Sequence, residues 1–406
     1  MAKVLCYTSP ARGHLYPMVP VLSELRDRGH DVVLLTLGEE VERMAALGRF
    51  RVRPISSAIE AIPLDDYRAR TTMGSLERAV ATFATRAEHE VPDLRAALRE
   101  ERPDVVLVDF NSWGAMAVAE ASSAPWAAFL PYLLPWPRPG IPPFGPGLAP
   151  RHDVIGKLRD ALVGRVVSAV TNRGLPRLDA VRAKVGLGPL GAMSEHGRAA
   201  HRLLYFTAPP FEYEDSSPFE RLVAVGPCAW EPPGERPAWL VAEERPVVLV
   251  TCSTELQADG ALVQACLDGL AQEDVLVVAT SGAIDPLSFR VPHNARVERF
   301  VPHTPVLERA ACVVSHGGMG ITQKALLAGV PVCVVPFGRD QHEVARRVEV
   351  ARAGVRVDKA HLSPGRLQEA VRVVRGLRAG AARVAEGFRR AGGAARAAQE
   401  IESLVR

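Results

Sequence analysis

Several features that would define a specialised class of protein are missing from this 406-residue chain. The net charge is only +3, with 49 basic and 46 acidic residues spread along the sequence, which argues against a nucleic-acid-binding protein. No apolar stretch is long enough, and free enough of proline and charge, to span a bilayer. The apolar run at residues 3–7 is too short for a secretory signal, so we expect a cytoplasmic protein.

Motifs for redox, metal and nucleotide chemistry are also scarce. The six cysteines form no C-x-x-C pair, and those in apolar runs read as reduced core thiols: Cys6, Cys252, Cys312 and Cys333. Neither H-E-x-x-H nor D-x-D occurs, so we expect no catalytic metal. The string from Gly186 to Gly191 matches a dinucleotide fingerprint only as text. It follows a helical pattern and contains Pro189, which indicates a loop.

The chain does contain two series of alternating strand and helix patterns. In the first series, buried runs at 3–8, 31–37 and 104–108 alternate with helices such as 17–28. The second series starts with the apolar run at 246–252 and repeats the pattern. This alternation predicts an α/β protein with two doubly wound, Rossmann-like domains facing one another across a cleft.

Composition sets the expected boundaries. We predict an N-terminal domain over 1–210 and a C-terminal domain over 237–388, because the chain is too long for one ordinary core. Residues 211–236 are rich in proline, glutamate and serine and are assigned to a linker. A final helix over 389–406 is in a position to pack back on the first domain.

A glycine-rich turn directly after a buried strand predicts an anion site. Gly317, Gly318 and Gly320 remove side chains that would keep a phosphate away from the backbone. Unpaired N–H groups of the following helix add partial positive charge, and His316 and Thr322 flank the turn as hydrogen-bond donors. A diphosphate is expected here.

Two residues near the carboxyl ends of strands in the first series suggest acid–base chemistry. His14 follows the first strand and Asp109 follows the 104–108 strand, so both belong to one edge of a parallel sheet. A carboxylate that holds one imidazole nitrogen stabilises the cation formed when the other nitrogen takes a proton. The alternative is that His14 caps a turn and Asp109 caps a helix.

Further donor-site candidates follow strands of the second series. Asp340 and Gln341 offer acceptor and amide groups suited to sugar hydroxyls, although Asp340 also fits a helix N-cap. Ser253 and Thr254 are candidates for phosphate contacts, with helix capping again the simpler alternative.

Aromatic residues in the first domain are candidates to bind an apolar molecule. The proline- and glycine-rich stretch 131–150, predicted to be irregular, carries Tyr132, Trp136 and Phe144. Trp113 and Met116 lie at a helix start, where plain core packing is the alternative.

In this order and spacing the motifs resemble the family-1 glycosyltransferases with the GT-B fold, especially the actinobacterial enzymes that modify antibiotics and other natural products. The segments that carry the resemblance are Arg12-Gly13-His14, Phe300-Val301-Pro302-His303, the 316–320 turn, Ala328-Gly329-Val330-Pro331 and Asp340-Gln341.

The resemblance implies an inverting sugar transfer from a UDP- or TDP-sugar to a hydroxyl of a hydrophobic aglycone, without a metal or other cofactor. His14 would be the general base and Asp109 its orienting partner. The resemblance assigns the diphosphate to His316, Gly317, Gly318, Gly320 and Thr322, the sugar to Asp340 and Gln341, and the nucleobase to Phe300 and the backbone of Val301.

One position departs from the family pattern. Many members carry a glutamate where this chain has Lys324, and that glutamate binds the ribose hydroxyls. Lysine cannot accept those hydrogen bonds, so either Gln323 replaces it or the donor has less ribose to recognise. The second option favours a thymidine donor, which lacks the 2′-hydroxyl.

Two other functions stay open at this point: a sugar-nucleotide epimerase of the same architecture, and a non-catalytic auxiliary protein that binds nucleotide sugars. The sequence does not identify the sugar, the aglycone or the atom that is glycosylated, and it fits a monomer or a homodimer.

Overall fold

The computed structural model describes residues 1–69, 71–215, 219–253 and 259–405, and two parallel sheets organise that part of the chain. The strands of the first sheet, in spatial order, are β3 (Arg51–Pro54), β2 (Asp31–Thr36), β1 (Lys3–Tyr7), β4 (Val105–Asp109), β5 (Trp126–Leu130), β6 (Arg202–Tyr205) and β7 (Leu222–Ala224). The strand order reverses direction between β1 and β4, where a doubly wound sheet opens a crevice.

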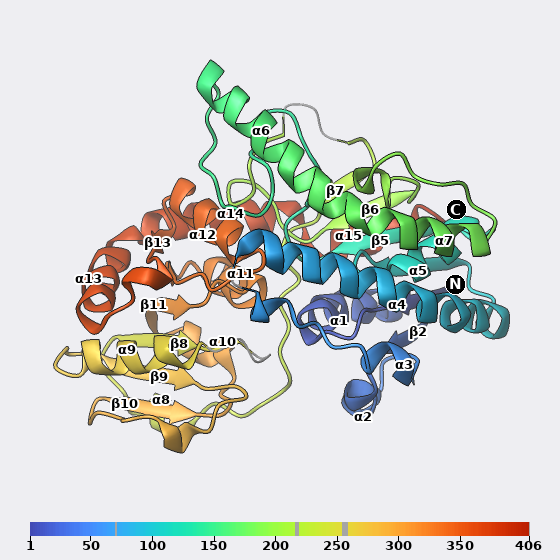
Figure 1. Cartoon of the computed structure of the whole chain (residues 1–406). Coiled ribbons are helices and arrows are strands. Elements are labelled where there is room, and N and C mark those ends of the chain that lie inside the picture. Colours follow the sequence, from blue (N-terminus) through green and yellow to red (C-terminus); the bar gives the residue numbers. More distant parts are fainter. Residues whose placement is uncertain (70, 216–218, 254–258, 406) are drawn as a thin grey trace.

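The second sheet repeats this winding. Its strands, in spatial order, are β10 (Ala295–Glu298), β9 (Leu276–Thr280), β8 (Val247–Thr251), β11 (Ala310–Ser315), β12 (Val332–Val334) and β13 (Gly354–Arg356). Its switch point lies between β8 and β11. The predicted fold class is therefore confirmed, and the two sheets face each other as separate lobes (Figure 1).

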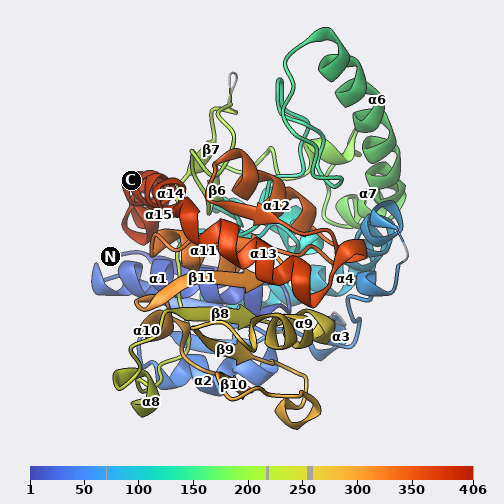
Figure 2. The ribbon, with the colours of Figure 1, turned by 90° about the vertical axis from the view of Figure 1, so that its left-hand side faces the viewer.

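Helices cover the faces of both sheets (Figure 2). The first domain contains α1 (Arg12–Asp27), α2 (Val41–Ala46), α3 (Ser57–Glu60), α4 (Thr72–Glu101), α5 (Trp113–Ala121), α6 (Val154–Thr171) and α7 (Leu175–Lys184). The second series comprises α8 (Ala238–Val241), α9 (Gly260–Leu270), α10 (His303–Leu307), α11 (Met319–Leu327), α12 (Gln341–Val350), α13 (Pro364–Val374), α14 (Arg378–Ala391) and α15 (Gly393–Glu402). No helix or strand occurs in 131–150, in agreement with the irregular structure predicted there.

The predicted linker 211–236 contains a strand that the sequence did not reveal. β7 pairs in parallel with β6 and extends the first sheet at its edge. Three residues are too few to show a period-two pattern, and the surrounding proline and glutamate obscure them. The chain then crosses to the second domain between β7 and β8.

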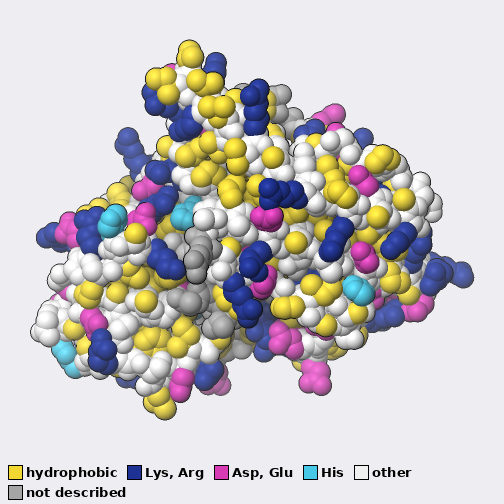
Figure 3. All heavy atoms as spheres, in the orientation of Figure 1, with side chains coloured by type: hydrophobic (Ala, Val, Ile, Leu, Met, Phe, Trp, Pro, Cys, Tyr) yellow, Lys and Arg dark blue, Asp and Glu magenta, His cyan; other side chains and the backbone are white. Residues whose placement is uncertain are grey.

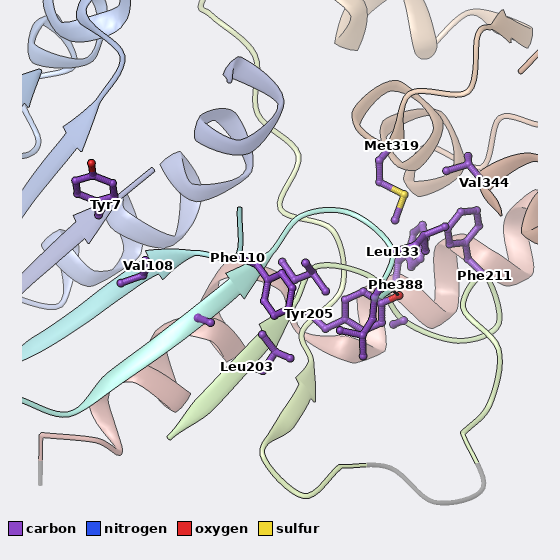
Figure 4. Close-up of a cluster of buried hydrophobic side chains, with 14 of the residues drawn as sticks. Tyr7, Val108, Phe110, Leu133, Leu203, Tyr205, Phe211, Met319, Val344 and Phe388 are labelled. Atoms are coloured by element: carbon purple, nitrogen blue, oxygen red, sulfur yellow. Dashed lines mark hydrogen bonds between the residues drawn. The ribbon is translucent and has the colours of Figure 1, made fainter. Parts of the chain in front are cut away.

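The chain returns to the first domain at its end. Phe388 of α14 packs against Phe211, with ring centroids 5.8 Å apart, in a core cluster that draws side chains from both domains (Figure 4). α15 then lies on α1, where Ile401 joins the core on that side of the first sheet. The backbone N–H of Gly393 donates to the carbonyl of Val225 at 2.7 Å, which joins the two crossings.

α6 stands out from the first domain as a raised helix (Figures 1 and 2). Its outer side exposes a row of apolar residues, visible at the top of the molecule in Figure 3: Val154, Ile155, Leu158, Leu162 and Val166. Small residues of its other side, Ala161 and Gly164, line the large cavity of the molecule. This helix therefore forms part of the cavity wall.

Candidate active site

His14 and Asp109 meet at the switch point of the first sheet. Nδ1 of His14 lies 3.0 Å from Oδ1 and 2.9 Å from Oδ2 of Asp109, which is the last residue of β4. α1 begins at Arg12 rather than at Pro17, because Pro17 is accommodated inside the helix instead of starting it. His14 is therefore held in a first helical turn and not in the loop that we predicted.

Asp109 is fully buried and its oxygens are well supplied with donors. Oδ2 accepts the backbone N–H of Ser9 at 3.0 Å and its hydroxyl at 2.6 Å, and Oδ1 accepts the N–H of Asn111 at 2.9 Å. Burial by itself raises the pKa of Asp109, but the charge and hydrogen bond of His14, with the other donors, outweigh it and leave the pKa lowered. The carboxylate therefore stays ionised beside the imidazole.

The second nitrogen of His14 is directed to a polar group that the sequence did not single out. Nδ2 of Asn111 lies 3.4 Å from Nε2 of His14, and the side-chain Oδ1 of Asn111 accepts a hydrogen bond from the hydroxyl of Tyr132 at 2.6 Å. If Nδ1 donates its proton to Asp109, Nε2 carries the lone pair, which is the tautomer that a general base needs. Asn111 directly follows the predicted Asp109 strand, and that proximity was the available signal.

The glycine turn lies at the switch point of the second sheet, directly after β11. Gly317 has a φ of +91°, and a Cβ there would lie 2.5 Å from Val334 Cγ1, so both the backbone conformation and the available space require glycine. α11 begins at Met319, which puts Gly320 and Thr322 in its first turns. A Cβ on Gly320 would meet nothing within 4 Å, so the backbone is open there.

Polar atoms around this turn lack protein partners. Thr251 Oγ1, Thr322 Oγ1 and His316 Nδ1 are buried without a hydrogen bond to any described residue. Burial lowers the pKa of His316, Asp259 with its Oδ2 3.6 Å from Nδ1 opposes the shift, and Arg339 adds to it. Buried polar atoms without partners are uncommon in proteins, so this arrangement fits a polar ligand.

Two predicted phosphate contacts have different outcomes. The backbone N–H of Ser253 donates to Asp259 Oδ2 at 2.6 Å, at the start of α9, and Ser253 lines the cavity. Thr254 lies outside the described residues.

Asp340 and Gln341 stand at the start of α12 and line the cavity. Gln341 Oε1 accepts the N–H groups of Phe337 at 2.7 Å and Gly338 at 3.1 Å, so this amide shapes the loop before it. Asp340 occupies the N-cap position without a side-chain capping bond to the described residues. Burial raises the pKa of Asp340, whereas the charges of Arg339 and His14 lower it. Asp340 and His14 both line the cavity.

Contacts between the domains close the cleft beside this loop. The Arg339 guanidinium binds the buried carboxylate of Asp66 through two hydrogen bonds of 2.9 Å. Glu343 Oε1 accepts the N–H groups of Gly145 at 2.9 Å and Gly147 at 2.7 Å, which ties the proline-rich loop to α12. Sequence reasoning did not find these partners, because they are far apart along the chain.

A cavity of about 1840 Å³ runs along the cleft and reaches both switch points. Its lining includes four predicted acceptor residues, Trp113, Tyr132, Trp136 and Phe144. His14, His316, Gly318 and Gly320 also line it, whereas Gly317 and Thr322 are not among its lining residues. The prediction for Met116 is wrong: its side chain is buried in the core of the first domain and does not line the cavity. The alternative of core packing holds for that residue, because the inner side of α5 faces the sheet.

At the other end of the cavity, Phe300 is half exposed and lines the wall, while Val301 is buried behind it. A carboxylate is present beside Lys324, although it comes from another part of the chain. Nζ of Lys324 lies 2.7 Å from Oε2 of Glu231, a linker residue that also lines the cavity. Burial raises the pKa of Glu231, but Lys324 and the N–H groups of α10 lower it to about 2. Gln323 instead donates to the carbonyl of Phe206 at 2.8 Å.

Comparisons with known proteins identify the family. The model for the erythromycin biosynthesis protein CIII-like C-terminal domain matches residues 264–404. The 4'-demethylrebeccamycin synthase of Lentzea aerocolonigenes is 34% identical over 391 residues, which cover 92% of this chain and 91% of that protein. The chain therefore belongs to the actinobacterial antibiotic glycosyltransferases.

Solved structures agree on the fold. The calicheamicin glycosyltransferase CalG4 matches 100% of this chain and 98% of its own, with a TM-score of 0.78 and 22% identity. The spinosyn rhamnosyltransferase SpnG, complexed with thymidine diphosphate, matches 98% of this chain and 100% of its own, with a TM-score of 0.72 and 19% identity. The two-domain architecture is the GT-B fold.

The described residues contain neither a membrane-spanning helix nor a cluster of metal ligands. None of their helices combines the length and apolar character that a membrane crossing requires. No group of three or more His, Cys, Asp or Glu side chains among them is arranged to hold a metal ion.

Proposed function

We propose that this glycosyltransferase moves a sugar from a UDP- or TDP-sugar to a hydroxyl of a large apolar acceptor, with inversion at the anomeric carbon. The observation that best supports the proposal is that His14, held by the buried Asp109, lines a cavity that also reaches Asp340 and the glycine turn. Such a pair can deprotonate an acceptor next to a bound donor.

In the proposed reaction, Nε2 of His14 takes the proton of the acceptor hydroxyl. The acceptor oxygen bonds to the anomeric carbon as the bond from that carbon to the diphosphate oxygen breaks. The proton stays on the imidazole, whose positive charge is stabilised by the Asp109 carboxylate, and the nucleoside diphosphate leaves. One-step displacement inverts the configuration of the sugar carbon. General-base catalysis of this kind contributes about 10²–10⁴-fold.

We assign the stabilisation of the leaving diphosphate to the start of α11. The N–H groups exposed around Gly318 and Gly320 and the partial positive charge of the helix would meet the phosphate oxygens. The unpartnered atoms of His316, Thr322 and Thr251 would complete the site. We therefore expect neutral hydrogen-bond donors, rather than a bound metal, to stabilise the negative charge of the leaving diphosphate.

The donor nucleoside is assigned to the wall formed by Phe300, Lys324 and Glu231. Phe300 would stack on the base, as the family resemblance implies. Because Lys324 engages Glu231, the ribose meets an ion pair here rather than a free carboxylate. SpnG, a solved protein of the same fold, holds thymidine diphosphate. Either a UDP- or a TDP-sugar is compatible, and we favour TDP.

The acceptor is assigned to the first-domain part of the cavity, which is mainly apolar. Trp113, Tyr132, Trp136 and Phe144 supply aromatic surface there. SpnG has also been solved with spinosyn aglycone, an acceptor held by the same fold. The volume of the cavity allows a polycyclic or macrocyclic molecule beside the nucleotide sugar.

Incubation with TDP-glucose or UDP-glucose and a panel of polyketide aglycones tests the proposal. Mass spectrometry of the products should find free nucleoside diphosphate and an acceptor heavier by one hexose. A new sugar nucleotide without any glycosylated product would instead indicate an epimerase. Binding of nucleotide without turnover on every acceptor would indicate an auxiliary protein.

A further inference from the structure

The deep end of the cavity contains a histidine that the reaction does not use. His196 follows the short 3-10 helix Met193–Glu195, is only 2% exposed, and lines the cavity. Neither ring nitrogen has a hydrogen bond to any described residue. A buried imidazole with two unsatisfied nitrogens is unusual, because each unpaired polar group loses its hydration without compensation.

The surroundings of His196 are aromatic. Its ring lies 5.7 Å from that of Trp113, at an interplanar angle of 68°, and 6.3 Å from that of Phe110. Phe110 also makes an edge-to-face contact with Trp136 at 5.8 Å. Gly197 allows this packing, since a Cβ there would lie 2.9 Å from Phe110. These rings line an apolar part of the cavity, in which the imidazole of His196 is a polar group without a protein partner among the described residues.

Arg182, whose charge acts on His196, has its hydrogen bonds to other groups. Arg182 binds Glu120 through two hydrogen bonds of 2.8 and 3.0 Å and donates to the Gly188 carbonyl at 2.8 Å. Burial, with a smaller contribution from the charge of Arg182, lowers the pKa of His196 to about 3. The imidazole is therefore neutral near pH 7 and offers one donor and one acceptor.

We propose that His196 is a specificity residue for the acceptor, hydrogen-bonding an oxygen or nitrogen on an aromatic ring that lies in the cavity against Phe110, Trp113 and Trp136. Phe110 is adjacent in sequence to Asn111, which contacts His14, so this part of the cavity adjoins the site where the acceptor would react. The acceptor would thus carry a second polar group, remote from the hydroxyl that receives the sugar. The ligand's role as acceptor rests on the proposed function, but its binding does not.

The test measures the binding of 2-naphthol, with naphthalene, which lacks the hydroxyl, as the control probe. Binding is followed by quenching of tryptophan fluorescence, without any donor present. We expect the wild-type protein to bind 2-naphthol about three- to tenfold more tightly than His196→Phe does. That variant keeps the ring and removes both nitrogens, so the two proteins should bind naphthalene equally.

Thermal unfolding provides the second readout. His196→Phe should leave the Tm unchanged or higher, because no protein partner is lost. His303→Phe is the matched control: Nε2 of His303 lies 3.3 Å from Thr280 Oγ1, so its loss should lower the Tm. The proposal is overturned if His196→Phe binds 2-naphthol as tightly as the wild-type protein does, if the wild-type protein binds neither probe, or if His196→Phe lowers the Tm as His303→Phe does. Absence of sugar transfer would overturn the proposed function and leave these binding results intact.

Discussion

The two sheets have the same winding, yet the sites at their switch points differ in how complete they are. In the first sheet, Asp109 has its acceptors filled and His14 is fixed against it. In the second sheet, the hydroxyls of Thr251 and Thr322 are buried without partners among the described residues. If the proposed roles hold, the groups that react are fixed by protein contacts, whereas the groups that bind the donor have their hydrogen bonds completed by the ligand.

Removal of the imidazole should produce the largest effect. We expect His14→Ala to lower kcat by about 10²–10⁴-fold, since the proton acceptor is lost, while nucleoside diphosphate affinity stays the same. Turnover by mass spectrometry and Kd by calorimetry measure the two quantities. His30→Ala is the control, because that imidazole contacts Glu402 away from the cavity. A His14→Ala rate near that of the wild type would refute the base assignment.

The second-largest effect is expected when the ion pair between the two domains is removed. Arg339→Ala leaves the buried carboxylate of Asp66 without its guanidinium partner. We expect the free energy of unfolding to fall by about 3 kcal/mol, and the acceptor KM to rise because the domain contact beside Asp340 is lost. Chemical denaturation and steady-state kinetics measure these changes. Arg372→Ala removes an exposed pair with Glu369 and should change neither.

A smaller and more selective effect is expected at the open backbone of the second site. Gly320→Ala adds a methyl group where no protein atom lies within 4 Å, so the fold should keep or slightly raise its Tm. The same methyl group occupies space that a phosphate needs, and we expect nucleotide affinity to fall about tenfold. Gly365→Ala in α13 is also sterically open and should leave affinity unchanged. Equal nucleotide affinities for all three proteins would show that the phosphate lies elsewhere.

The pH dependence of stability should show the smallest effect. The folded-state pKa of Glu231 is about 2, below its ordinary value near 4.5, so its pair with Lys324 stabilises the protein above pH 4.5. That stabilisation is lost as pH falls from 4.5 towards 2, when the carboxylate is protonated. Glu231→Gln lacks this stabilisation at every pH. The difference in free energy of unfolding between the wild-type protein and the variant should therefore decrease as the pH falls from 4.5 towards 2. Urea unfolding at pH 7, 4 and 3 measures this difference, and a constant difference would contradict the assignment.

The predictable part of this molecule is the part determined by local pattern and sheet topology. Apolar runs revealed the central strands, and the rule for strand order brought His14 to Asp109 across 95 positions. Short edge strands such as β7 carry no such pattern. Glu231 reaches Lys324 because the linker passes beside α11, and no local sequence pattern predicts the path of the linker. The burial of Met116 could not be predicted from the pattern of α5, because apolar residues occupy nearly all of its positions.

The ends of the chain meet on one side chain. The backbone N–H of Ala2 donates to Nδ1 of His30 at 3.2 Å, and Nε2 of the same ring lies 3.0 Å from Glu402. The C-terminal lobe is thus an insertion within the N-terminal one, entered after β7 and left at Gly392. A chimera made with a single cut in the linker would therefore graft a foreign α15 onto the host's α1. Exchange of the nucleotide-sugar lobe between relatives needs two cuts, with the last helix kept from the host.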